Sequence, residues 1–171
     1  MFASLGVWLL IFAALLMVAA AILARRFRAQ PGIQALNTLL WVVAVHSVLI
    51  VASLGATTFQ TRLFWDQLTA IPASLIGPLV FIMVYSYTEP ERPLRSHHIL
   101  LLMIVPVMTV ILALTSNYHQ LFTYDCGLQV LGSTSRLHCR IGAWFWVHYV
   151  YTVLMVSIPT GYLLIKQRRD I

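Results

Sequence analysis

The dominant pattern along the chain is five long apolar runs separated by short polar segments. None of the runs contains Asp, Glu, Lys or Arg, and each is close to the roughly 17 to 25 residues that a helix needs to cross a bilayer. The runs cover residues 5–24, 36–56, 68–87, 99–115 and 141–165. The pattern therefore predicts five membrane spans.

Composition supports the same interpretation. Hydrophobic residues make up 60% of the 171 residues and charged residues only 9%, far from the roughly one quarter charged in soluble proteins. Every backbone amide in lipid must be satisfied within its own segment, and no stretch alternates as a barrel strand would. We therefore expect an all-α polytopic helix bundle that forms a single membrane domain over residues 1–171.

The net charge of +6 has a topological explanation. Eight of the eleven basic residues follow the first, third and fifth runs, and the remaining three lie in the other connections. Cytoplasmic segments are enriched in Lys and Arg, so the N-terminus is expected outside and the C-terminus in the cytoplasm. This distribution argues against binding to nucleic acid, which basic composition alone would suggest.

The longest connection, residues 116–140, is then an outer loop and holds both cysteines, Cys126 and Cys139. Thiols in an oxidising compartment favour a disulfide, although two unpaired cysteines and a zinc site with His119 and His138 are alternatives. The zinc alternative lacks the usual ligand spacing, so no metal is expected. Glycine and serine in the loop predict turns rather than a folded domain.

Polar side chains at membrane depth are the candidate functional residues, because they are costly unless they face the bundle interior. His46 lies near the middle of the second run, and Trp144, His148 and Tyr151 share one face of the fifth, with Tyr149 beside them. This face would suit a small ligand that enters from the outer side. The alternative is a core histidine that bonds a neighbouring helix.

Prolines occur inside three successive runs, at Pro72, Pro78, Pro106 and Pro159. Kinks at these positions either shape an internal cavity or only improve packing. We expect a ligand cavity between the second, third and fifth spans. In this hypothesis His148 and Tyr151 contact the ligand, His46 lies deeper, and His119 lies at the mouth.

An ordered set of residues extends across nearly the whole chain. It comprises Trp65, Pro72, Phe81, Tyr85, Thr88, Pro106, Thr109, Thr115, Asn117, His119, Leu121, Gly142, Phe145, Trp146, Tyr149, Tyr151 and Gly161. The set resembles the N-terminal seven-transmembrane region of bacterial sensor histidine kinases. The most specific segment is Thr115–Leu121, after the fourth run, and Gly142–Tyr151 is similar to the start of that family's fifth helix.

The resemblance implies a sensory input module in the bacterial plasma membrane that responds to an unknown ligand or membrane signal. Its implied partners are the lipid bilayer and a cytoplasmic output domain or kinase, and small-residue spacings such as Ala20 with Ala24 permit a homodimer. That family has two further helices, so the chain looks truncated after the fifth. No phospho-acceptor or ATP-binding motif is present, so neither enzyme activity nor a cofactor is expected.

Two other classes of protein remain as alternatives. Histidines on separate spans can ligate a b-type haem, and His46 with His148 would be the pair here. A small transporter or a structural membrane subunit is the other alternative, although no acidic residue lies within the runs to couple a cation.

Overall fold

Five long helices form the protein, and their order follows the five apolar runs. The structure, a computed structural model, describes residues 2–131 and 134–169. The helices are α1 (Phe2–Ala24), α2 (Ile33–Gly55), α3 (Phe59–Thr88), α4 (Ser96–Leu114) and α5 (Ala143–Arg169). All five are long and apolar enough to cross a membrane, as the five apolar runs predicted.

The helix α3 is longer than its apolar run. Its first turn begins at Phe59 because Thr58 caps it, with the Thr58 hydroxyl accepting a hydrogen bond from the Thr61 amide at 3.3 Å. The polar segment before residue 68, including Arg62 and Asp66, is therefore helical rather than a loop.

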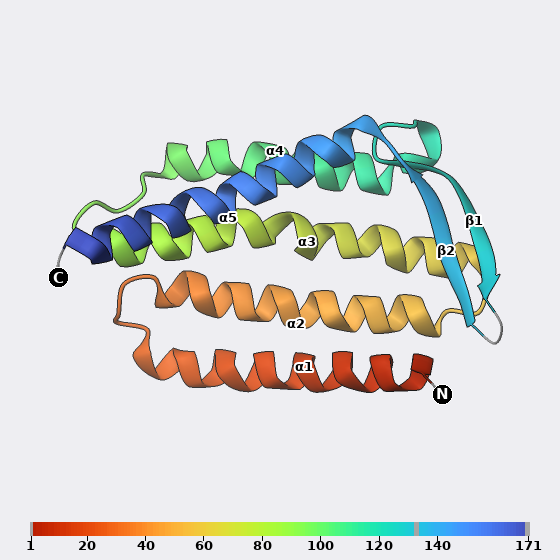
Figure 1. The fold of residues 1–171 in the computed structure, drawn as a ribbon, viewed down its shortest axis with the longest axis horizontal. Coiled ribbons are helices and arrows are strands. Elements are labelled where there is room, and N and C mark those ends of the chain that lie inside the picture. Colours follow the sequence, from red (N-terminus) through yellow and green to blue (C-terminus); the bar gives the residue numbers. More distant parts are fainter. Residues whose placement is uncertain (1, 132–133, 170–171) are drawn as a thin grey trace.

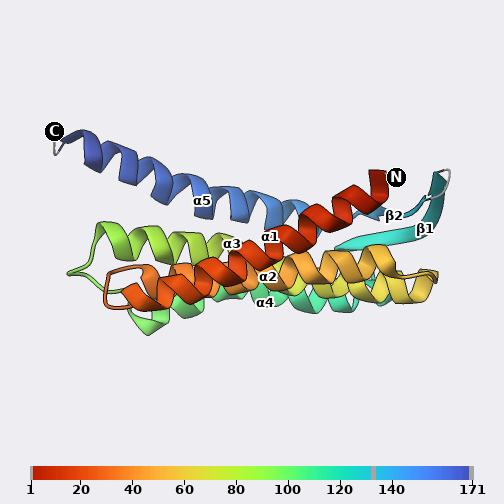
Figure 2. The ribbon, with the colours of Figure 1, turned by 90° about the horizontal axis from the view of Figure 1, so that it is seen from below.

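The central helix of the bundle is α3, which lies between α2 and α5 and also contacts α4 (Figure 1). The first helix packs against α2 at the far side of the bundle. Seen from below, α1 crosses α2 obliquely, and α5 lies to one side of the layer formed by α2, α3 and α4 (Figure 2). The arrangement gives α5 two neighbours, α3 and α4.

The two ends of the bundle differ in their connections. One end carries the N-terminus and the segment between α4 and α5, and we call it the hairpin end. The other carries the turn between α1 and α2, the loop between α3 and α4, and the C-terminal part of α5. We call it the Arg92 end, after a residue of the α3–α4 loop.

The connection between α4 and α5 corrects the sequence-based expectation. Instead of turns alone it forms an antiparallel pair of strands, β1 (Thr123–Leu131) and β2 (Thr134–Ile141), so the fold is a helix bundle with a small sheet. The base of this hairpin is fixed by Gly142, whose amide donates to the Phe122 carbonyl at 2.7 Å. A Cβ atom at Gly142 would lie 2.3 Å from the Gln120 carbonyl oxygen, which explains the glycine.

The buried residues of the bundle are small. Ala21, Ser74, Thr109 and Ala113 are at most 1% exposed, whereas Trp8 is 68% exposed. Membrane helices associate through small residues that let their backbones approach, and their large apolar side chains face lipid. The distribution is therefore that of a bundle whose outer surface lies in a bilayer.

The four prolines singled out in the sequence all lie inside continuous helices and are all buried. Pro78 and Pro106 are among the most completely buried side chains in the described residues. Each proline lacks an amide hydrogen and so leaves the carbonyl four residues earlier without its usual helical partner. These carbonyls are places where another helix can donate a hydrogen bond.

Candidate functional site

Two hydrogen bonds hold α5 against α4. The Trp144 indole Nε1 donates to Thr109 Oγ1 at 3.0 Å, and the Tyr151 hydroxyl donates to the Leu102 carbonyl at 2.6 Å. The donors are seven residues apart on α5, and the acceptors are seven apart on α4 in the opposite direction. The two helices therefore run antiparallel in a fixed register over about two turns.

The Leu102 carbonyl is free to accept the Tyr151 hydrogen bond because of Pro106. Pro106 removes the amide that would otherwise bond the Leu102 carbonyl within α4. Tyr151 supplies the missing donor from α5, which satisfies a carbonyl that would be costly to leave unpaired in lipid. Pro106 and Tyr151 thus act together as one helix–helix contact.

Between these two bonds lies His148, one turn after Trp144. The Nδ1 atom of His148 and the hydroxyl of Thr152, one turn further along α5, are both buried and have no hydrogen-bond partner among the described residues. Thr152 packs on α3 at Gly77, where a Cβ atom would lie 3.3 Å from the Thr152 Cα. The buried side of α5 thus contains two polar atoms with unused hydrogen-bonding capacity, and one of them, the Thr152 hydroxyl, lies where α5 packs on α3.

His46 occupies a different part of the bundle. Its imidazole lies against the Thr69 backbone of α3, and its Nδ1 atom has no hydrogen-bond partner in the described part of the chain. His46 belongs to α2 and His148 to α5, and α3 lies between these two helices (Figure 1). This arrangement gives no support to a haem held between the two histidines.

His119 lies at the hairpin end and bonds its own segment. Its Nε2 atom lies 3.0 Å from the Thr115 hydroxyl, and its Nδ1 accepts from the Leu121 amide at 3.2 Å. It lines a cavity of about 420 Å³ together with Phe59, Asn117 and Asp125. His119 therefore shapes the chain between α4 and β1, beside a small polar cavity.

Tyr149 lies on another face of α5. It is 53% exposed, and its ring makes an edge contact with Trp146, their centroids 6.0 Å apart. The structure thus places Trp144, His148 and Tyr151 on a face that meets other helices, and it does not bring Tyr149, His46 or His119 to the same place.

The hairpin holds both cysteines. Cys126 and Cys139 are joined by a disulfide with an S–S distance of 2.07 Å, close to the irregularity in strand pairing between Tyr124 and Gly127. Disulfide sulfurs are not the thiolates that zinc needs, and no group of three or more potential metal ligands occurs in the described residues. Beside the bond, Arg140 and Asp125 form an exposed ion pair at 3.3 Å.

Two polar contacts were not anticipated from the sequence. Arg62, only 5% exposed, donates from Nε to the Ser53 carbonyl at 3.1 Å and from Nη2 to the Leu54 carbonyl at 3.2 Å, at the C-terminus of α2. Its position in a polar stretch suggested only a loop charge. The signal was its distance from the end of the preceding run, which allows an arginine to fold back onto that helix.

The second contact lies at the Arg92 end. Glu89, directly after α3, accepts hydrogen bonds from the Tyr162 hydroxyl at 2.7 Å and from Lys166 Nζ at 3.0 Å, and Lys166 also donates to the Thr88 carbonyl. These two hydrogen bonds, from Tyr162 and then Lys166, hold the pKa of the Glu89 carboxyl below its ordinary value. The spacing of Tyr162 and Lys166, one turn apart on α5, is the sequence signal for a shared partner.

Five apolar helices with buried small residues and polar helix–helix contacts define a multi-pass helical membrane protein. The family model of the N-terminal 7TM region of histidine kinase matches residues 9–170, so the chain belongs to that family of membrane sensory regions. The predicted resemblance and the location in the bacterial plasma membrane are thereby confirmed. No curated protein and no solved structure matches the chain.

Proposed function

We propose that the chain is the input module of a histidine kinase-type receptor and receives its signal where α5 meets α3, around His148. Family membership supplies the class of protein. The location rests on one observation, the two buried polar atoms of His148 and Thr152 that lack partners among the described residues. A buried polar atom without a partner is costly, so a ligand or rearrangement that supplies a hydrogen bond to it is stabilised.

Orientation follows from charge and from the cysteines. The N-terminus and the hairpin lie outside, and the Arg92 end lies in the cytoplasm, because basic residues gather at that end. The disulfide in the hairpin supports this orientation, since disulfides persist in oxidising compartments.

The orientation is tested with truncated fusions to alkaline phosphatase, which is active only outside the cytoplasm. A fusion after Gln120 should be active and one after Glu91 inactive. The reverse pair of activities would show that the bundle is inverted.

Signalling requires two arrangements of α5 that the signal binds with different affinity, because a ligand shifts an equilibrium only by that difference. The bonds of Trp144 and Tyr151 to α4 hold α5 in one register, and the close approach of Thr152 to Gly77 holds it against α3. A signal that engages His148 changes the balance between these contacts. The displaced end of α5 then acts on a cytoplasmic output domain.

The test uses the intact receptor, reconstituted with its output domain. His148→Phe fills the polar contact with an apolar ring, so basal kinase autophosphorylation should change. Leu154→Phe, an exposed position on the same helix, is the matched control. If both variants behave like the wild type at equal abundance in the membrane, the α3–α5 contact is not the site of signal reception.

A further inference from the structure

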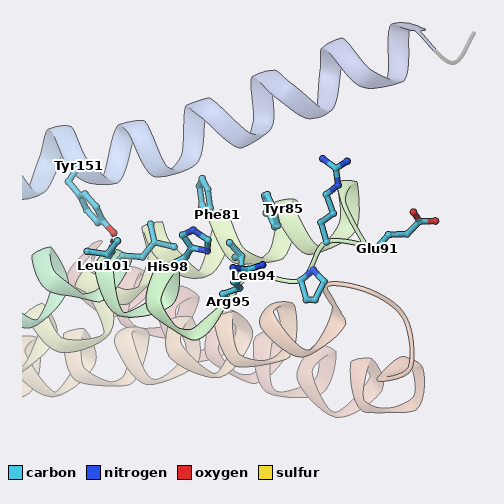
Figure 3. A pocket seen from close by; sticks show the side chains of 11 residues that line it. Phe81, Tyr85, Glu91, Leu94, Arg95, His98, Leu101 and Tyr151 are labelled. Atoms are coloured by element: carbon cyan, nitrogen blue, oxygen red, sulfur yellow. Dashed lines mark hydrogen bonds between the residues drawn. The ribbon is translucent and has the colours of Figure 1, made fainter.

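A large cavity lies at the Arg92 end of the bundle, and His148 is not among the residues that line it. It measures about 890 Å³ and opens between α3, the α3–α4 loop, α4 and α5 (Figure 3). Its apolar wall includes Phe81 of α3 and Leu101 and Leu102 of α4, and Tyr151 closes it toward the bundle centre. Its lining includes neither His148 nor Thr152, although it includes both partners of the Tyr151–Leu102 bond.

The mouth of the cavity carries basic side chains. Arg92, Arg95 and His98 line it, and all three are exposed. The α4 helix begins at Ser96 with no acidic residue in its first turn, so its positive end adds to the same field. The mouth therefore combines two guanidinium groups with the positive end of a helix.

Acidic residues near the mouth leave this positive character in place. Glu91 also lines the cavity, but its carboxylate points away from the other labelled side chains (Figure 3). Glu89 lies close enough to feel the Arg92 charge, and it is bonded to Tyr162 and Lys166. Of the charged residues that line the opening, Glu91 is acidic and Arg92 and Arg95 are basic, so the opening keeps a net positive charge.

We propose that this cavity, the Arg92 cleft, binds a phospholipid with an anionic headgroup. Arginine forms paired, charge-assisted hydrogen bonds with phosphate oxygens, and basic pockets between membrane helices recognise acidic headgroups. The apolar wall at Phe81, Leu101 and Leu102 receives an acyl chain, which a free phosphate lacks. Charge at the mouth and hydrocarbon below it match the two parts of one lipid molecule.

The lipid would also connect two elements. The cleft is bounded by α4 on one side and by Tyr151 of α5 on the other. A bound lipid fills the space between these helices and favours the arrangement in which the Tyr151 bond to Leu102 is made. The anionic lipid is thus a structural ligand at the end of the bundle opposite the hairpin.

The experiment is native mass spectrometry of the purified chain in detergent with an equimolar mixture of dioleoyl phosphatidylglycerol and dioleoyl phosphatidylcholine. The wild type should retain phosphatidylglycerol in preference to phosphatidylcholine. In the double variant Arg92→Gln/Arg95→Gln, retention should fall by roughly 30-fold, as two lost arginine contacts near a membrane surface imply. The double variant Arg26→Gln/Arg28→Gln removes equal charge from the same end of the bundle and should retain the lipid.

Each other outcome is decisive. Equal loss of phosphatidylglycerol from both double variants would contradict the proposal, because surface charge alone would then bind the lipid. Retention of phosphatidylcholine as strong as that of phosphatidylglycerol would also contradict it, because the headgroup charge would then not matter. Displacement of the lipid by inorganic phosphate would identify a site for a free anion instead. Unchanged retention of phosphatidylglycerol in Arg92→Gln/Arg95→Gln would overturn the proposal and leave the cleft to another occupant, such as a polypeptide. The variant Arg92→Lys/Arg95→Lys keeps the charge and should restore most retention, which separates lost binding from lost folding.

Discussion

At the scale of single residues, the most informative pair is Pro106 and Tyr151, because one removes a backbone hydrogen bond and the other replaces it. The Leu102 carbonyl loses its helical partner to the proline and gains the tyrosine hydroxyl at 2.6 Å. Unpaired carbonyls are costly in lipid, so each residue accounts for the presence of the other.

This coupling is measurable as a double-mutant cycle. Tyr151→Phe should lower the free energy of unfolding by about 1 kcal/mol, because the Leu102 carbonyl is left unpaired. In a Pro106→Ala background the helix can restore its own bond, so the same change should cost much less. Unfolding in mixed micelles, followed by circular dichroism, gives the four values, and equal costs in both backgrounds would contradict the coupling.

Arg62 is a second residue whose role is set by backbone carbonyls. Arg62→Ala removes donors to the Ser53 and Leu54 carbonyls and should lower the unfolding free energy by about 1 to 3 kcal/mol. Arg140→Ala, at an exposed ion pair, is the matched control and should change stability by well under 1 kcal/mol. The same unfolding measurement compares them, and equal costs would show that the buried contacts of Arg62 add nothing.

Much at this scale could be predicted from the sequence, and some could not. Periodicity correctly placed Trp144, His148 and Tyr151 on one helix face, because helical geometry alone decides that. It could not say that Trp144 and Tyr151 bond α4 while His148 has an unpaired atom, since those facts depend on the register between two helices. Helix register is set by packing that no single segment encodes.

At the scale of elements, the contact of α3 with α5 depends on Gly77. A Cβ atom there would meet the Thr152 Cα at 3.3 Å and the Met155 Cβ at 3.4 Å, so a large side chain must push α5 away. Gly77→Leu should therefore lower the unfolding free energy by about 1 to 3 kcal/mol.

The control for that change is Gly161→Leu, because a Cβ atom at Gly161 would meet nothing within 4 Å. Unfolding of both variants in the same detergent should show a loss only for Gly77→Leu. Similar losses for the two would mean that helix propensity rather than close packing sets the effect.

The hairpin is the element that sequence analysis predicted least well. Gly127 and the neighbouring polar residues suggested turns, yet β1 and β2 pair over most of their length. Their pairing is fixed by the ends of α4 and α5 and by the bond between Cys126 and Cys139, all of which act across the loop rather than along it. A two-stranded hairpin is marginal alone, so local patterns underestimate it.

The disulfide should be essential to that hairpin. Cys126→Ser/Cys139→Ser removes a loop closure worth on the order of 3 kcal/mol and should expose β1 and β2 to proteolysis while leaving the helices protected. Limited proteolysis with mass analysis identifies the cut sites. Cleavage within the helices at the same rate would show that the bond supports the whole bundle.

At the scale of the whole molecule, α5 is attached at both ends to different helices. Near the hairpin end it bonds α4 through Trp144, and at the Arg92 end Lys166 and Tyr162 bond Glu89 at the end of α3. The two attachments differ chemically, since only the second includes an ionisable acceptor.

The second attachment should depend on pH. Because hydrogen bonds from Tyr162 and Lys166 lower the pKa of Glu89, its contribution is fully present above the ordinary value of 4.5 and is lost as the pH falls through the lower folded value. Glu89→Gln should therefore flatten the decrease of stability below pH 4.5. Thermal unfolding between neutral and acidic pH tests this, and parallel curves for the wild type and Glu89→Gln would contradict it.

The double attachment of α5 also has a mechanical consequence. A helix that is bonded to two different neighbours tilts when those neighbours shift relative to each other, even if neither shift is large. Trp144 near the start of α5 bonds α4, and Lys166 near its end bonds Glu89 after α3, with the Thr152–Gly77 contact between them. A small displacement of α3 against α4 therefore becomes a tilt of α5. The helix thus reports a difference between two neighbours rather than the position of either one.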